Sequence, residues 1–171
     1  MEYKSSRQFS IDHDLYASKG QRFANLLIDY VCQLFLMMAL LFVIAIVCIL
    51  LGSDAIAERM QHTTRIEEYA ITIAVHLIYY NFFELLFSRT IGKFITQTVV
   101  VTAEGEKPSS QQILMRSLCR LIPFDALSFL GAPDKGWHDS ISKTYVVKNA
   151  LLHERKRASS SLGQIGQTAE D

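Results

Sequence analysis

Two long stretches of the chain are almost purely hydrophobic, and the charged residues are concentrated outside them. The first stretch, residues 30–51, has Gln33 as its only strongly polar member, and the second, residues 69–87, is mostly apolar. At about 1.5 Å per helical residue, both can cross a hydrocarbon core of about 30 Å. The pattern therefore predicts two transmembrane helices, over residues 23–51 and 69–87.

A third apolar stretch, residues 113–130, is interrupted by charges and by a proline. It contains Arg116, Arg120, Pro123 and Asp125. An arginine at the bilayer centre costs at least about 2.5–3.5 kcal/mol on insertion scales. We therefore expect a membrane-associated helix over 113–130, amphipathic or re-entrant, at the cytoplasmic leaflet. The alternative is a third span whose arginines are buried against the other helices.

Two short stretches, residues 96–102 and 144–148, are rich in β-branched residues. Their backbone groups need partners if they lie in or near lipid. We expect residues 98–101 to pair with residues 145–147 in a small cytosolic β ribbon. The predicted fold class is an all-α membrane protein with two transmembrane helices, the third amphipathic or re-entrant helix and this ribbon.

The remaining segments are polar and divide the chain into three parts. We expect an N-terminal tail over 1–16, a membrane domain over 17–150 and a C-terminal tail over 151–171. The last stretch, "ASSSLGQIGQTAED", is typical of disorder. The first hydrophobic run is too long for a signal-peptide core and follows a polar stretch, so we expect a retained anchor.

Positive charge is unevenly distributed around the two predicted spans. Four lysines and arginines precede the first span, whereas the loop 52–68 contains only Arg59 and Arg65. Because lysine and arginine favour the cytoplasmic side, both termini are expected in the cytoplasm and the loop 52–68 outside. The expected location is the plasma membrane, with the bacterial inner membrane as the first choice.

Each predicted span carries one polar face, made by residues three or four apart: Arg22, Asn25, Asp29 and Gln33 on the first, and Thr72, His76, Tyr80 and Glu84 on the second. We expect His76 to form a hydrogen bond between helices. Asp29 and Glu84 fall near the cytoplasmic ends of the spans, and Arg116 and Arg120 approach from the same side. A carboxylate at the acyl-chain boundary needs a cation or a wet cavity, and Arg22, Arg116 and Arg120 are the possible partners of Asp29, so a charge cluster with carboxylate–guanidinium contacts is expected. The alternative is that these charges extend to the headgroups independently.

Three segments resemble the RDD family of membrane proteins, which is named for one arginine and two aspartates. "ASKGQRFANLLIDY" is similar to the family's opening, and matches its arginine and first aspartate at Arg22 and Asp29. "FELLFSRTIGKFITQTVVV" and the following residues up to Arg116 are similar to its second-helix exit. "GWHDSISKTYVV" resembles its closing motif and places the second aspartate at Asp139. The resemblance covers roughly residues 17–147 and implies a membrane fold; transport of unidentified ligands has been suggested for the family.

Composition and motifs restrict the functions further. Net charge is zero, so nucleic acid is not an expected partner, and the three cysteines lack metal-ligand spacing. Because no nucleophile–base pair or phosphate-binding glycine loop is visible, we expect no enzyme, no cofactor and no metal. The expected partners are membrane lipids, further copies of the chain or a larger membrane complex, and a small ion or solute.

Three functions fit these expectations. In the first, the protein transports an ion or solute as an oligomer, with Asp29 and Glu84 as carriers. In the second, it is a scaffold or accessory subunit whose charges lock the helices together. In the third, Lys93, Arg116 and Arg120 bind anionic lipid headgroups.

Overall fold

The computed structural model describes residues 10–52, 55–131 and 135–168. Its first and longest helix, α1 (Lys19–Leu51), begins at a capping box in which the Ser18 hydroxyl accepts the Gln21 N–H at 3.2 Å. The same glutamine accepts the Ser18 N–H at 3.0 Å, which satisfies a second free donor of the first turn. The helix ends where Gly52 takes the left-handed conformation, which glycine adopts without a steric cost.

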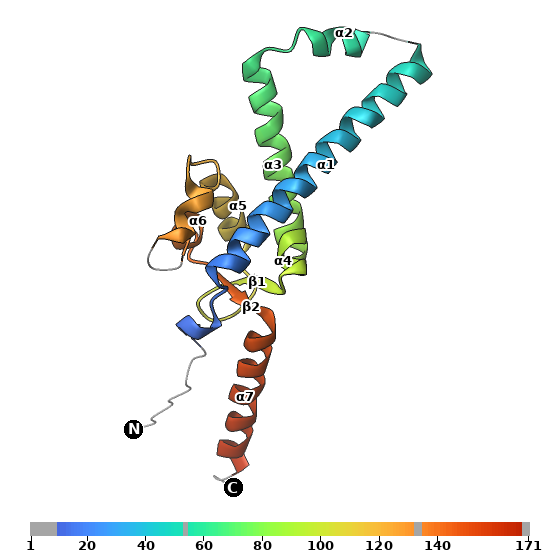
Figure 1. Cartoon of the computed structure of the whole chain (residues 1–171). Helices are drawn as coiled ribbons and strands as arrows, with labels where there is room; N and C mark the ends of the chain where they lie inside the picture. Colours follow the sequence, from blue (N-terminus) through green and yellow to red (C-terminus); the bar gives the residue numbers. More distant parts are fainter. Residues whose placement is uncertain (1–9, 53–54, 132–134, 169–171) are drawn as a thin grey trace.

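The second long helix, α3 (Arg65–Phe87), also begins at a capping box, formed by Thr64 and Glu67. A short helix, α2 (Ala55–Gln61), lies between α1 and α3 in the chain. The two long helices cross near the middle of the molecule and diverge toward α2, so the three helices form a triangle (Figure 1). Among the described residues, α1 and α3 are the helices long and apolar enough to cross a membrane.

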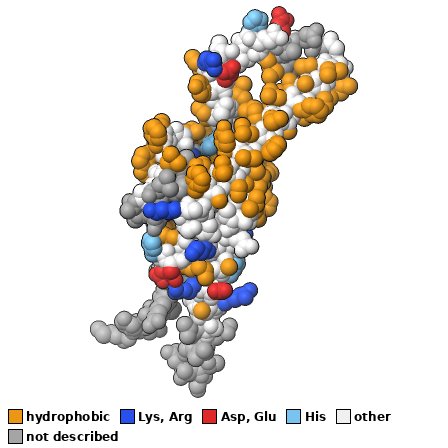
Figure 2. Space-filling model, viewed as in Figure 1, with side chains coloured by type: hydrophobic (Ala, Val, Ile, Leu, Met, Phe, Trp, Pro, Cys, Tyr) orange, Lys and Arg blue, Asp and Glu red, His pale blue; other side chains and the backbone are white. Residues whose placement is uncertain are grey.

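The side chains buried on the two long helices are mostly polar. In α1 the buried residues are Arg22, Asn25 and Asp29, and in α3 they are two tyrosines and Glu84. Hydrophobic side chains instead cover the outer surface of both helices, whereas charged side chains gather around α2 and in the lower half of the molecule (Figure 2). Such an outer surface suits hydrocarbon rather than water as its surroundings.

Below the crossing of α1 and α3, short elements form a compact junction. They are α4 (Ile91–Ile95), β1 (Thr98–Val101), α5 (Ser110–Cys119), the 3₁₀ helix η2 (Asp125–Leu130), α6 (Trp137–Ile141) and β2 (Tyr145–Lys148). A short 3₁₀ helix, η1 (His13–Leu15), precedes α1, and α7 (Asn149–Thr168) extends away at the end opposite α2 (Figure 1).

The predicted β ribbon is confirmed. β1 and β2 pair in antiparallel orientation, with Val101 opposite Tyr145 and Val99 opposite Val147. Valines of both strands pack with Leu15 of η1 and Leu152 of α7 in a small hydrophobic cluster. The ribbon therefore connects the segment before α1 to the C-terminal helix, and it orients the elements that hold the charged residues.

The prediction of one helix over 113–130 is wrong. α5 ends at Cys119 and η2 starts at Asp125, after Phe124 adopts a positive φ of 67°. Pro123 lacks an N–H group and disfavours a helical conformation at the preceding residue, so a break at this point has a local cause. With 10 residues, α5 is roughly 15 Å long, which is too short for a third span.

The prediction of a disordered tail is wrong for most of its length, because α7 continues to Thr168. Leu152 is 5% exposed and anchors the first turns of α7 to the ribbon. Glu154, Arg155, Lys156 and Arg157 follow, and residues of these types are good helix formers even without a buried face. Beyond them the helix continues through serines and glycines, whose helix propensity is low.

Candidate functional site

A cluster of buried charges lies at the junction. Seven charged side chains there are at most 6% exposed: Arg22, Asp29, Glu84, Lys93, Arg116, Asp125 and Asp139. They come from α1, α3, α4, α5, η2 and α6, so the cluster forms only when these elements pack together. A buried charge is tolerated only when it is paired and hydrogen-bonded, which makes the partners of each group decisive.

Glu84 is surrounded by three cations. Its Oε1 atom accepts Lys93 Nζ at 2.7 Å and Arg120 Nη2 at 3.0 Å, and its Oε2 atom lies 3.2 Å from Arg116 Nε. The predicted contact between a membrane-helix carboxylate and the arginines of α5 is therefore confirmed for Glu84. This group joins the last turn of α3 to α4 and α5.

Asp139 is held by two arginines from opposite sides. Arg22 Nη1 and Arg116 Nη1 both donate to its carboxylate, and Arg116 Nη1 also donates to Thr144 Oγ1 at 2.8 Å. Burial alone would raise the pKa of Asp139, but Arg116 and Arg22 outweigh burial and hold that pKa well below its usual range. Arg116 therefore bridges two carboxylates, and Arg22 connects α1 to α6.

Asp29 is buried with neutral donors. Its carboxylate accepts the Tyr79 hydroxyl at 2.8 Å, the Thr90 hydroxyl at 2.6 Å and the Gly92 N–H at 2.8 Å. Arg22, expected from the sequence as a possible partner of Asp29, pairs with Asp139 instead. Asp29 thus attaches α3 and the start of α4 to α1 through hydrogen bonds that do not use a cation.

Gly92 allows α4 to lie directly against α1. A Cβ atom at this position would lie 2.7 Å from the Asn25 carbonyl oxygen and 3.0 Å from Asp29 Oδ1. Only a residue without a side chain fits this approach.

Lys93 lies in the cluster, where its ammonium group pairs with Glu84. It is 3% exposed, and burial lowers its pKa to about 8 although Glu84 opposes the shift. The turn at Ser88, with φ 56°, reverses the chain and brings Lys93 back onto Glu84, which sequence spacing alone does not reveal.

Asp125 and His138 are a further buried pair. His138 donates its backbone N–H to Asp125 Oδ1 at 2.9 Å, and its ring Nδ1 lies 2.6 Å from Asp125 Oδ2. Burial lowers the pKa of His138, which favours the neutral ring. The sequence marked Asp125 only as an obstacle to a third span, so its role in fixing α6 was missed.

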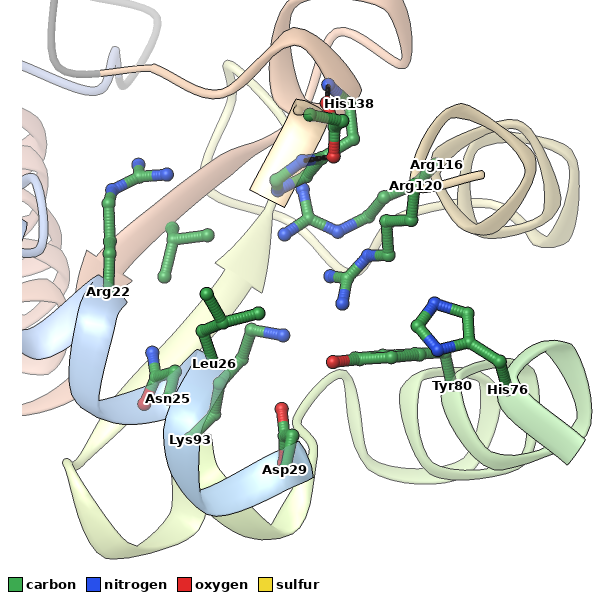
Figure 3. Close-up of a pocket in the computed structure, with 12 residues that line it drawn as sticks. Arg22, Asn25, Leu26, Asp29, His76, Tyr80, Lys93, Arg116, Arg120 and His138 are labelled. Carbon is green, nitrogen blue, oxygen red and sulfur yellow. Dashed lines mark hydrogen bonds and ion pairs between the residues drawn. The ribbon is translucent and has the colours of Figure 1, made fainter. Parts of the chain in front are cut away.

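A cavity of about 80 Å³ lies between these groups. Its charged lining residues are Arg22, Asp29, Lys93, Arg116, Arg120 and Asp125. Figure 3 shows Lys93, Arg116 and Arg120 directed toward the same space, with the Tyr80 hydroxyl facing them. A cavity of this volume with polar walls has room for several water molecules or a small ion.

His76 lines the same cavity from α3. Its Nδ1 atom lies 3.1 Å from Gln33 Oε1, so the predicted hydrogen bond between the two long helices is confirmed. If Gln33 accepts at this oxygen, Nδ1 carries the proton and Nε2 has a lone pair. Within the described part of the chain, Nε2 has no hydrogen-bond partner.

Two apolar helices with lipid-suited outer surfaces and a buried ion-pair cluster define the class of this chain as a membrane protein. The sequence model of the RDD family matches residues 16–151, and the chain belongs to that family. The resemblance noted in the sequence is thereby confirmed. No curated protein and no solved structure shows significant similarity to the chain.

Proposed function

We propose that the protein is a non-enzymatic, oligomeric membrane protein that binds a small ion or polar solute in the charged cavity and moves it across the membrane. The observation that carries the proposal is the cavity of about 80 Å³, which lies between α1 and α3 and has guanidinium, ammonium and carboxylate groups in its wall. Ionisable groups at membrane depth are expensive and commonly mark ion or solute pathways.

The arrangement of the spans supports the proposal of an oligomer. α1 and α3 diverge from the crossing point toward α2, and their outer side chains are exposed (Figure 1). Two diverging helices leave the cavity without a protein-lined route to the other side of the membrane. Further copies, or another membrane subunit, would supply the missing walls.

The proposed orientation has both ends of the chain in the cytoplasm. The residues before α1 and after β2 share one side of the molecule, because Ala17 N–H donates to the Val146 carbonyl at 2.9 Å. The basic residues of α7 are on this side, and lysine and arginine favour the cytoplasm. The bacterial inner membrane is the proposed location.

Cysteine labelling in intact cells tests the orientation. In a variant with Cys32, Cys48 and Cys119 replaced, an impermeant thiol reagent should label His62→Cys and leave Ser159→Cys unlabelled. Labelling of Ser159→Cys without permeabilisation would reverse the proposed orientation.

Flux into liposomes tests the transport proposal. Purified protein should carry a tracer ion at a rate above empty liposomes, and Asp29→Asn should lower that rate because Asp29 positions α4 and the Lys93 that α4 brings to the cavity. Asp12→Asn is the matched control, since Asp12 has an exposed carboxylate outside the cluster. Equal flux in protein-containing and empty liposomes, across sodium, potassium, chloride and phosphate gradients, would contradict the transport proposal.

The second candidate function is a scaffold or accessory subunit. This candidate is favoured because both oxygens of Asp139 are paired with arginines and Asp29 accepts three hydrogen bonds. Such pairing makes the site rigid and does not leave these carboxylates free to bind and release a ligand. A scaffold predicts no flux, together with co-purification of a stable membrane partner that is lost when the cluster is disrupted.

A further inference from the structure

The hydrogen-bonding capacity left unused around the cavity includes more N–H donors than acceptors, the acceptors being His76 Nε2 and Glu84 Oε2. Arg22 Nε, Arg116 Nη2 and Arg120 Nε are buried and have no hydrogen-bond partner among the described residues. The three side chains are 5%, 1% and 12% exposed, so bulk water does not satisfy these groups. A buried donor without a partner costs about 1–3 kcal/mol, which a bound acceptor would recover.

The carboxylates, in contrast, are already occupied. Asp29 accepts three hydrogen bonds, and both oxygens of Asp125 face His138. Glu84 Oε1 has two cationic donors, and its Oε2 forms an ion pair with Arg116 Nε at 3.2 Å but accepts no hydrogen bond from the described residues. A metal cation entering the cavity would therefore have to displace existing partners before it found a free carboxylate oxygen.

The charge in the cavity wall also favours a negative ligand. Four cations line it, Arg22, Lys93, Arg116 and Arg120, against the two acids Asp29 and Asp125. Glu84 and Asp139 balance the remaining charge from behind the wall, since they pair with the same cations. Three of the cations that line the cavity, Arg22, Arg116 and Arg120, thus also carry donors without a partner.

We propose that the cavity binds a small oxyanion of the phosphate or carboxylate class, held by Arg116 and Arg120 with Arg22 and Lys93 beside them. This inference rests on the proposed function in that it names the chemistry of the ligand in the same cavity. The planar guanidinium group matches two oxygens of such an anion at once, and hydrogen bonds from charged donors are the stronger kind. The Tyr80 ring supports this arrangement, because the Arg120 guanidinium stacks over it at 3.8 Å from the ring centroid.

Two sources can supply this chemistry, a free anion and the headgroup phosphate of an anionic lipid. The cavity is lined by residues of α1 and α3 where these helices meet the junction, and hydrophobic side chains cover the outer surface of both helices (Figure 2). A headgroup could reach it from the membrane surface, and a free anion from water. The experiment therefore has one arm for each source.

In the first arm, delipidated protein in neutral detergent is titrated with inorganic phosphate at constant ionic strength. Thermal unfolding is followed by the fluorescence of Trp137, the only tryptophan of the chain and the neighbour of His138 and Asp139. The melting temperature should rise with phosphate and reach a plateau, since a ligand that binds the native state stabilises it. Exchange of sodium for potassium or choline should have no effect.

Arg120→Gln should weaken phosphate binding at least tenfold, and Arg120→Lys, which keeps the charge but loses the planar fork, should weaken it to an intermediate degree. Arg157→Gln is the matched control because Arg157 is exposed on α7. If Arg120→Gln does not fold, the comparison of phosphate with sodium and potassium on the wild-type protein still decides whether the cavity binds an anion or a cation. Stabilisation by sodium or potassium without stabilisation by phosphate would overturn the inference and leave the proposed transport intact.

In the second arm, the protein is placed in nanodiscs of phosphatidylcholine alone or with phosphatidylglycerol. Stabilisation by phosphatidylglycerol that depends on Arg120, without a response to free phosphate, assigns the site to a lipid headgroup and supports the inference. No response in either arm would overturn it. Phosphate binding without flux in liposomes would support the oxyanion site while removing the transport proposal, so the two failures are distinguishable.

Discussion

Two regions of the molecule differ in which side chains they bury: the apolar arms, which are the parts of α1 and α3 between their crossing and α2, and the charged junction. On the arm of α1, Phe42 is 67% exposed and Ile49 is 78% exposed, whereas lower on the same helix Asp29 is 1% exposed. In a protein surrounded by water, large apolar side chains are inside and carboxylates outside. The reversal shows that lipid is the natural surroundings of the arms, because hydrocarbon does not drive apolar side chains inward.

The two regions also differ in what holds them together. The junction depends on specific partners that come from six elements, and each buried charge there becomes costly once its partner is lost. In the arms, the backbone hydrogen bonds are made within each helix, and most side chains face outward, where lipid would surround them. Substitutions should therefore be severe in the junction and mild on the arms.

The largest effect is expected for Arg116→Ala. This change leaves both Glu84 and Asp139 without one of their cations in a buried site. Breaking a buried pair typically costs about 3–5 kcal/mol, and the free energy of unfolding in detergent should fall by that amount. Adding Glu84→Gln should recover part of the loss, because it removes the excess negative charge that Arg116→Ala leaves in the cluster.

Arg65→Ala is the control for this comparison. Arg65 also forms an ion pair, with Glu68 at 3.8 Å, but its side chain is 90% exposed. If Arg116→Ala and Arg65→Ala unfold alike, the junction charges act independently and the contrast between the regions is lost.

The second effect concerns acid. The pKa of Asp139 is held well below its ordinary value of 3.8, so the folded state binds the proton less readily than the unfolded state. Its stabilising contribution is complete above about pH 5 and is lost as the pH falls below 3.8 toward the folded pKa. Arg22→Gln removes one of the groups that lower this pKa, so acid unfolding should begin at a higher pH, as measured by tryptophan fluorescence.

Arg155→Gln is the matched variant for the acid experiment. Arg155 pairs with Asp14 on the exposed surface and does not contact Asp139. The same acid midpoint in wild type, Arg22→Gln and Arg155→Gln would contradict the stabilising role of the Arg22–Asp139 pair.

A smaller effect is expected for Gly92→Ala. The added methyl group would meet the Asn25 carbonyl oxygen at 2.7 Å and force α4 away from α1. Overpacking of this kind typically costs about 1–3 kcal/mol, to be measured by chemical unfolding in detergent. Gly20→Ala is the control, since its nearest neighbour would be Ser18 Oγ at 3.9 Å, and it should unfold like wild type or at a slightly higher denaturant concentration. Equal stability of both variants would mean that α4 does not depend on this approach.

The smallest effect is expected on the arms. Phe42→Ala removes a side chain that is 67% exposed, so the same unfolding experiment should give a change within about 0.5 kcal/mol. Val100→Ala in β1, where the side chain is fully buried, should cost more than Phe42→Ala although fewer atoms are removed. The reverse order would indicate that Phe42 packs against a further protein subunit.

Several features of the protein follow from the sequence by itself. The two spans are set by the length of the hydrophobic runs, and the pairing of β1 with β2 by their β-branched residues and their need for backbone partners. The polar faces of α1 and α3 follow from spacing along a helix, since Asn25 and Asp29 on one and Tyr80 and Glu84 on the other are buried together. These are local properties, which a stretch of a few turns determines.

The choice of partners within the cluster was decided only by the tertiary structure. Arg22 lies closer in sequence to Asp29 but pairs with Asp139, 117 residues away, and Lys93 turns back onto Glu84. The sequence predicted that carboxylates and arginines would meet, because each is costly alone, but any of the pairings would satisfy that condition. The turn at Ser88, the break before η2 and the close approach at Gly92 fix the distances, and distance and direction decide which charges pair.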